Sequence, residues 1–176
     1  QGPITPRVYK PGDNVGPPNW VHNLEHGGLV VLYKPGGPGA TTAGMQALQT
    51  FFDTFPASPI CQIAPHLISP VIAPFDQMPH PFAALVWDRV FYLDSWDPAA
   101  VLQFFNTEAE RLDKDGTLVA PPEDVSGCNA RLHSAAPSAS GSASPSGSAS
   151  PAPSSGASAG SSVAPGGSPQ PSPGAS

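Results

Sequence analysis

Gly28-Leu-Val-Val-Leu-Tyr33, which is followed by Pro35-Gly36-Gly37-Pro38, is the stretch that decides the fold. A short apolar run of residues that favour extended backbone is typical of a strand in the middle of a sheet. The prolines and glycines after it end the run and predict a turn. We therefore expect a central strand at residues 28–33, with the other elements arranged around it.

Two segments further along the chain have apolar residues at helical spacing. The first begins at Thr41 or Thr42, either of which would cap the helix, and ends at Pro56 after about 14 residues. The second begins at Asp97-Pro98, with aspartate as N-cap and proline at the first helical position, and ends within residues 113–116. The apolar stripes of the two predicted helices are Met45, Leu48, Phe51, Phe52 and Phe55, and Val101, Leu102, Phe104, Phe105, Ala109 and Leu112.

Three further strands complete the expected sheet. Val71-Ile72-Ala73 lies between prolines and suits an edge strand, with residues 60–64 as the alternative. Residues 82–86 and 90–93 form a hairpin closed at Trp87-Asp88-Arg89. The order β-α-β-β-β-α predicts an α+β fold, a small two-layer sandwich whose mostly antiparallel sheet carries two helices on one face. A right-handed crossover through the first helix would make the first two strands parallel.

Composition divides the chain of 176 residues into three parts. Residues 1–20 are rich in proline and glycine and favour an extended arm laid on the domain. Residues 21–133 contain the predicted elements and suffice for one domain with one core. Residues 134–176 have no charged and no aromatic side chain, so we expect a disordered tail, because such a sequence buries too little apolar surface to offset its ordering entropy.

Charge and hydropathy exclude two classes of partner. The net charge is −6, and the seven Lys and Arg residues are scattered from Arg7 to Arg131. Binding to nucleic acid needs a concentrated basic surface, which this pattern does not provide. We also expect no membrane span in this chain, because no apolar run approaches 18 residues.

Three features together predict an exported protein, located outside the cell or at its surface. The chain begins with Gln1, as a processed product would. Cys61 and Cys128 are the right number for one disulfide in an oxidising compartment. The Ser-, Ala- and Pro-rich tail is typical of stalks on secreted or wall-associated proteins. The alternative is a trimmed cytosolic protein with two buried thiols.

The segment from Trp20 to Gly28 contains the candidate chemistry. It places His22, Glu25 and His26 within five residues, directly before the central strand. Two imidazole nitrogens and a carboxylate oxygen close together suit zinc or copper. The alternative is a structural role. Histidine next to a strand often serves as a hydrogen-bonding residue, and the two glycines would then only permit an unusual turn.

More distant residues offer further ligands for that metal. His66, His80 and His133 each carry an imidazole that would add a third nitrogen. Met78 lies two residues from His80 and would supply a soft thioether, which favours copper. The predicted metal ligands are therefore His22, Glu25, His26, Met78 and His80, and the expected cofactor is copper or zinc.

The same segment matches H-x-x-E-H, the inverted zinc-protease pattern, with Glu108 and Glu110 available downstream. That mechanism needs both histidines on one face of a stable helix, and Pro17-Pro18 and Gly27-Gly28 leave at most two turns here. No other catalytic motif is present: the sequence lacks G-x-S-x-G, a P-loop and G-x-G-x-x-G. The sequence therefore favours a binding protein over an enzyme.

A longer stretch resembles a known family. Val21-His-Asn-Leu-Glu-His-Gly-Gly-Leu-Val-Val-Leu-Tyr33 is similar to the signature of DUF3105, a bacterial and archaeal domain of unknown function. Residues 71–79, 82–87 and 93–97 fit the same pattern, so that the resemblance covers roughly residues 9–112. Members usually follow a membrane anchor or signal segment, which agrees with export. The family carries no established activity.

Two departures from the family pattern bear on the site. Members tend to have Ser-Gly-Pro-His before the histidine motif, whereas this chain has Gly16-Pro17-Pro18-Asn19. A histidine that would complete a site is therefore absent or replaced. Residues 58–69 look like an insertion, which the resemblance suggests is tied to the tail through a Cys61–Cys128 disulfide.

Three functions remain in order of preference. The first is an exported binding domain that holds a metal through the His-x-x-Glu-His cluster. The second is a structural or self-assembling module of the cell surface, whose proline-rich arm adds to the edge strand of a neighbour or contacts the cell wall. The third is a metal-dependent hydrolase with a cleft beside Glu25.

Overall fold

A computed structural model describes residues 2–121, 123, 128–130 and 132. The predicted tail at residues 134–176, and His133, lie outside these residues. The helices are α1 (Pro17–Glu25), η1 (Pro38–Ala40, a 3-10 turn), α2 (Thr42–Asp53), α3 (Pro65–Ile68) and α4 (Pro98–Glu108). The strands are β1 (Val30–Tyr33), β2 (Val71–Pro74), β3 (Phe82–Val86), β4 (Arg89–Leu93), β5 (Arg111–Leu112) and β6 (Leu118–Ala120).

The main sheet has four strands in the order β2-β1-β3-β4. The interior strand β1 is parallel to β2 and antiparallel to β3, and β3 is antiparallel to β4. Val31 stands opposite Ile72 on one side and Ala84 on the other. The α+β class, the central strand, the edge position of β2 and its parallel pairing are all confirmed.

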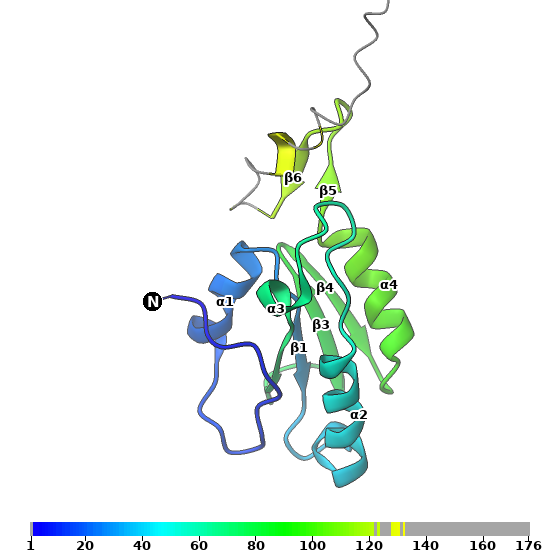
Figure 1. The fold of residues 1–176 in the computed structure, drawn as a ribbon. Coiled ribbons are helices and arrows are strands. Elements are labelled where there is room, and N and C mark those ends of the chain that lie inside the picture. The colour runs from blue at the N-terminus through cyan, green and yellow to red at the C-terminus, as the bar shows by residue number, and fades with distance from the viewer. Residues whose placement is uncertain (1, 122, 124–127, 131, 133–176) are drawn as a thin grey trace, which may run out of the picture. The chain divides into compact units, whose positions relative to one another are not determined.

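Helices α2 and α4 cover one face of this sheet, as expected (Figure 1). Each has the predicted N-cap: Gly44 N donates to Thr41 Oγ1 over 3.0 Å, and Ala100 N donates to Asp97 Oδ1 over 3.0 Å. These side chains satisfy backbone donors that the first helical turn leaves without a partner. The buried core on this face includes Val31, Tyr33, Leu48, Phe51, Phe82, Val101 and Phe105.

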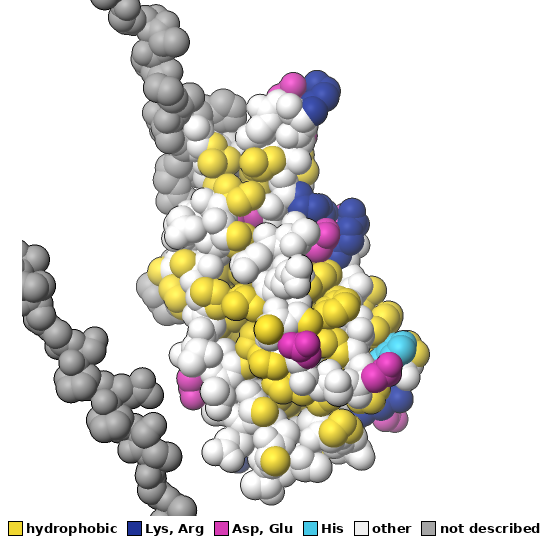
Figure 2. All heavy atoms as spheres, turned by 90° about the vertical axis from the view of Figure 1, so that its right-hand side faces the viewer, with side chains coloured by type: hydrophobic (Ala, Val, Ile, Leu, Met, Phe, Trp, Pro, Cys, Tyr) yellow, Lys and Arg dark blue, Asp and Glu magenta, His cyan; other side chains and the backbone are white. Residues whose placement is uncertain are grey.

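The surface outside this core is partly apolar. Figure 2 faces the side of α4 and shows apolar side chains in a broad band across it. The rings of Phe91 in β4 and Phe104 in α4 stack with centroids 5.6 Å apart, and both are partly buried against the core. Basic and acidic side chains lie next to one another at the edge of the band.

The opposite face carries α1, which was not predicted from the sequence (Figure 1). Pro17 and Pro18 begin this helix instead of preventing it, because the first helical N–H groups need no intrahelical acceptor. Asn19 Oδ1 accepts from Gly16 N over 2.9 Å and so caps the turn. Trp20 and Leu24 are buried against β1, so that helices cover both faces of the sheet.

The proline-rich arm is attached to the chain's own sheet. Tyr9 N donates to Ile72 O over 2.8 Å, and Ile72 N donates to Arg7 O over 3.0 Å. Val8 thereby forms a parallel bridge with Ile72 at the outer edge of β2. Further toward the N-terminus, the side-chain amide of Asn23 accepts from Ile4 N (3.0 Å) and donates to Ile4 O (2.9 Å). The arm is therefore held both at β2 and at α1.

A small second sheet and a disulfide follow α4. Strands β5 and β6 pair antiparallel, and neither was predicted. Cys61 and Cys128 form a disulfide with a Cα–Cα distance of 5.4 Å, which confirms the expected pairing. Both cysteines are buried with Leu118 in a third apolar cluster. In the described part of the chain, no helix is both long and apolar enough to cross a membrane.

Candidate metal site

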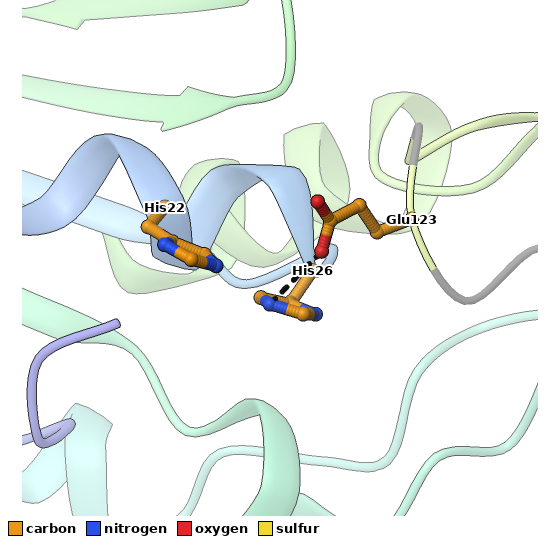
Figure 3. Close-up of side chains that lie close together, drawn as sticks. All are labelled: His22, His26 and Glu123. Atoms are coloured by element: carbon orange, nitrogen blue, oxygen red, sulfur yellow. Dashed lines mark ion pairs between the residues drawn. The ribbon is translucent and has the colours of Figure 1, made fainter. Parts of the chain in front are cut away.

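His22 and His26 lie on the same face of α1. They are four residues apart, close to one helical turn, so their side chains become neighbours. Their rings are stacked, with centroids 4.9 Å apart and an angle of 8° between the planes (Figure 3). His26 is the C-cap of the helix, and its backbone N donates to His22 O over 3.3 Å. The helix thus holds the two imidazoles in parallel.

Glu123 comes from the segment that follows β6 and reaches the histidines from the side (Figure 3). Its Oε2 lies 3.1 Å from Nε2 of His26. One ligand atom from each of His22, His26 and Glu123 can be chosen so that all three lie within 4.8 Å of one another. The backbone fixes this position, because Glu123 N donates to Glu25 O over 3.1 Å.

The two glycines after His26 bring the later segment close to α1. Gly27 has φ +83°, and a Cβ at this position would lie 2.8 Å from Cγ of Pro121. A Cβ on Gly28 would lie 2.7 Å from the carbonyl oxygen of Asn23. Both approaches are closer than real Cβ contacts allow. The glycines therefore allow the turn from α1 into β1, and they allow Pro121 to pack two residues before Glu123.

The structure brings together only part of the predicted ligand set. Among the described His, Cys, Asp and Glu residues, the close group contains His22, His26 and Glu123, and not Glu25 or His80. Glu25 directly precedes His26, and adjacent helical side chains point about 100° apart. The contribution of Glu25 that the structure shows is its backbone carbonyl, which accepts from Glu123.

Met78 and His80 have other surroundings. Met78 is buried in the apolar cluster under α1, together with Trp20 and Leu24. Nδ1 of His80 lies 2.8 Å from Asp94 Oδ1, and the His80 ring stacks on Tyr92 with centroids 5.1 Å apart. The side chain of Met78 therefore belongs to the core under α1, and that of His80 contacts Asp94 and Tyr92. His66 lies in α3.

The two glutamates that would complete a protease-like site are engaged elsewhere. Glu108 forms ion pairs with Arg89 (3.5 Å) and Arg111 (3.7 Å). Glu110 is buried, and its carboxylate accepts from the backbone N of Ile60 and from that of Cys61, the latter over 2.8 Å. Of the H-x-x-E-H pattern, α1 carries His22 and Glu25, and His26 is the C-cap that follows its last residue.

Glu123 is the site residue that sequence reasoning missed. It follows His26 by nearly a hundred residues and stands in no motif, next to Pro121-Pro122. The one useful signal is Cys128, five residues further on, because its disulfide with Cys61 returns this segment to the domain. The pairing of the cysteines alone does not place any particular side chain.

Two imidazoles and one carboxylate are ligand types that a borderline metal such as zinc accepts. Zinc bound to imidazole nitrogen at 2.0–2.1 Å in a tetrahedral site separates neighbouring ligand atoms by about 3.3 Å. The ligand atoms of His22, His26 and Glu123 lie within 4.8 Å of one another, so binding of a metal would have to draw these side chains closer together. Three protein ligands leave one position open, as in zinc sites that bind water or a further molecule.

Comparison with known proteins gave one family. The model of the family described as "Protein of unknown function (DUF3105)" matches residues 3–120, which include the arm, α1 and both histidines, and the match ends before Glu123 and Cys128. No curated protein matched the chain. No solved structure matched it either.

Proposed function

The chain belongs to this family, DUF3105, and we propose that it binds a divalent metal ion, zinc or copper, through His22, His26 and Glu123. The observation that carries the proposal is the convergence of three ligand atoms within 4.8 Å from two segments far apart in the sequence. Imidazole nitrogen and carboxylate oxygen are ligands that both metals accept.

Two features of the fold reduce the entropy that metal binding would cost. The histidines are fixed on one helix, and Glu123 is held by its backbone hydrogen bond to Glu25. A metal that binds ligands already close together orders fewer side chains. The side chains of His26 and Glu123 are 37% and 48% exposed, so an ion can reach them from solvent.

The ligand set does not separate zinc from copper. The expectation of copper came from the thioether of Met78, whose side chain is buried among the apolar residues under α1. Two nitrogens and one oxygen suit zinc and copper(II) alike, and the general order of affinities favours copper(II). Competition between the two ions on the purified protein will decide which is bound more tightly.

The test is elemental analysis of the purified full chain, followed by thermal melts with and without added zinc or copper. Preferential binding to the folded state predicts a gain of about 2.7 kcal/mol at a free metal concentration one hundred times Kd. His22→Ala with His26→Ala should abolish uptake and leave the fold formed, and Glu123→Gln should weaken uptake. His80→Ala is the matched control, because this histidine pairs with Asp94.

Two results would contradict the proposal. One is full uptake by the folded His22→Ala, His26→Ala variant. The other is an unfolded double variant together with a metal-free wild-type protein, which would make the pair structural, because loss of hydrogen-bonding groups costs stability. The variants Glu25→Gln and Met78→Leu test the ligands that were expected from the sequence.

The compartment proposed for this function is outside the cell or at its surface. The support is the Cys61–Cys128 disulfide, since disulfides persist mainly in oxidising compartments. Thiol labelling of the protein isolated from its native source tests this point. Two reactive thiols per chain in the native protein would contradict it.

A self-associating module is the second candidate, supported by one observation on β4. This strand is at an edge of the sheet and exposes the side chains of Val90 (48%) and Tyr92 (42%). Exposed edge strands can pair with another chain. The predicted donor of such a strand, the arm, is instead paired with β2 of its own chain. A dimer that forms without metal and is lost in Val90→Lys would favour this candidate.

A further inference from the structure

A cavity of about 530 Å³ lies beside His26. Its walls come from residues 3–6 of the arm, from Asn23 and His26 of the α1 region, and from Ile63, Ile68 and Ser69 around α3. Pockets of 300–1,000 Å³ are typical of small-molecule sites. The same histidine therefore borders the cavity and belongs to the proposed metal site.

The polar side chains in the cavity wall are mostly occupied. Both ends of the Asn23 amide are bonded to the backbone of Ile4, at 3.0 and 2.9 Å. Ser69 Oγ donates to Pro65 O over 2.7 Å. The rest of the wall is largely apolar, with Pro3, Ile63 and Ile68 among its residues. Of the three proposed metal ligands, His26 lines the cavity, so a metal bound to it would bring a charged group to the cavity wall.

The charges around the cavity indicate whether its ligand would be an anion or a cation. Of the described residues that line the cavity, none is Asp, Glu, Lys or Arg. A divalent ion bound by two neutral imidazoles and one carboxylate has a net charge of +1. An anion that enters the open coordination position would neutralise this charge.

We infer that the cavity binds a small carboxylate with an apolar body, whose carboxylate takes the open position on the metal held by His22, His26 and Glu123. This inference rests on the proposed function. The ligand displaces a metal-bound water molecule and forms no covalent bond with the protein. The apolar body contacts Ile63 and Ile68, so affinity should rise about fourfold for each buried methylene group.

The experiment uses the full chain loaded with Co²⁺, whose visible spectrum reports changes in coordination. Linear carboxylates from acetate to octanoate are titrated into it, with primary alcohols of the same lengths as controls. The metal spectrum shows whether the head group reaches the ion, and calorimetry gives the affinity. We expect each carboxylate to change the spectrum, affinity to rise with chain length until the cavity is filled, and the alcohols to bind far more weakly.

Substitutions at Ile63 test the role of the cavity independently of the metal ligands. Ile63→Trp fills the cavity and should remove the gain with chain length, while acetate still changes the spectrum. Val119→Trp is the matched control, because Val119 is 54% exposed and does not line the cavity. If Ile63→Trp fails to fold, Ile63→Ala should lower the affinity for octanoate severalfold and leave that for acetate unchanged.

The outcomes distinguish this inference from the function on which it rests. If no Co²⁺ spectrum develops before any carboxylate is added, the metal site itself fails. If the metal binds but acetate and octanoate have equal affinity, the cavity takes no apolar body and the inference is overturned. It is also overturned if alcohols bind as tightly as carboxylates, or if carboxylates bind equally well without metal.

Discussion

The two faces of the sheet are built in different ways. The face under α2 and α4 is closed by a large apolar cluster in which many aromatic rings contact one another, among them Phe55 and Phe105 with centroids 4.9 Å apart. The face under α1 has a smaller cluster and depends on specific contacts: the Asn23 amide, two glycines and a segment returned by a disulfide.

This difference separates stability from function. Apolar contacts are numerous and non-directional, so the first face should carry most of the free energy of folding. The second face holds polar side chains at set positions, and metal binding needs such positions within fractions of an ångström. Changes on the first face should therefore unfold the protein, whereas changes on the second should move the ligands.

The largest effect is expected for Phe105→Ala on the first face. Phe105 is fully buried between α4 and the sheet, and removal of a buried ring leaves a cavity. The free energy of unfolding should fall by about 3–5 kcal/mol. Urea unfolding measures the change, with Phe104→Ala as the partly buried control. A loss below about 1 kcal/mol would mean that this face does not dominate the stability.

The next largest effect is expected for removal of the disulfide, which holds the segment of Glu123 near the second face. Cys61 and Cys128 are 67 residues apart, and their bond restricts the unfolded chain. The double variant to serine should lose about 2–4 kcal/mol of stability. It should also bind metal more weakly, because the segment that carries Glu123 is released. Urea unfolding and metal titration of the same samples check both points, and unchanged metal affinity would separate Glu123 from the disulfide.

These two regions also differ in how far the sequence predicts them. The first face follows from local patterns: Thr41 and Asp97 cap helices whose apolar spacing is regular, and residues 28–33 form the central strand. Each signal lies within one element, and burial of its apolar side joins the elements. The α+β class, the parallel pairing of β1 with β2 and the helices α2 and α4 could therefore be predicted from the sequence.

The second face depends on contacts between distant segments. His22 and His26 were identified because they are close in sequence, whereas Glu123 is brought to them by tertiary structure. Pro17-Pro18 suggested irregular backbone, although prolines at the start of a helix are compatible with it, and α1 was missed. Met78 and His80 were chosen by residue type, and residue type does not report which other side chains surround a residue in the fold.

A smaller effect on the second face is expected for Gly27→Ala. Alanine at φ +83° costs about 1–2 kcal/mol, and its Cβ would also displace Pro121 and, with it, Glu123. Gly116→Ala is the matched control, since Gly116 has φ +77° and nothing lies within 4 Å of the added Cβ. Both variants should lose stability, but only Gly27→Ala should lower metal affinity. Equal metal affinity in the two would show that the contact with Pro121 does not position Glu123.

The smallest effect is expected for a change at Tyr33, which contacts both the core under α2 and α4 and the arm. Its ring belongs to the core under α2 and α4, while its hydroxyl donates to Tyr9 O of the arm over 2.7 Å. Burial, and then the nearby Asp13 carboxylate, raise the pKa of Tyr33 from 10.0 to about 12. The folded protein therefore holds this proton more tightly than the unfolded chain does.

The sign of the pH dependence follows from that shift. The stabilisation due to Tyr33 is complete below pH 10, where both states are protonated, and is lost progressively as the pH rises from 10 through 12. Tyr33→Phe should lose about 1 kcal/mol at neutral pH, from the missing hydrogen bond, and should lack this alkaline component. Urea unfolding between pH 8 and about pH 11 checks this, with the exposed Tyr92→Phe as control. If the wild type and Tyr33→Phe lose stability in parallel across that range, the hydroxyl does not link the arm to the core.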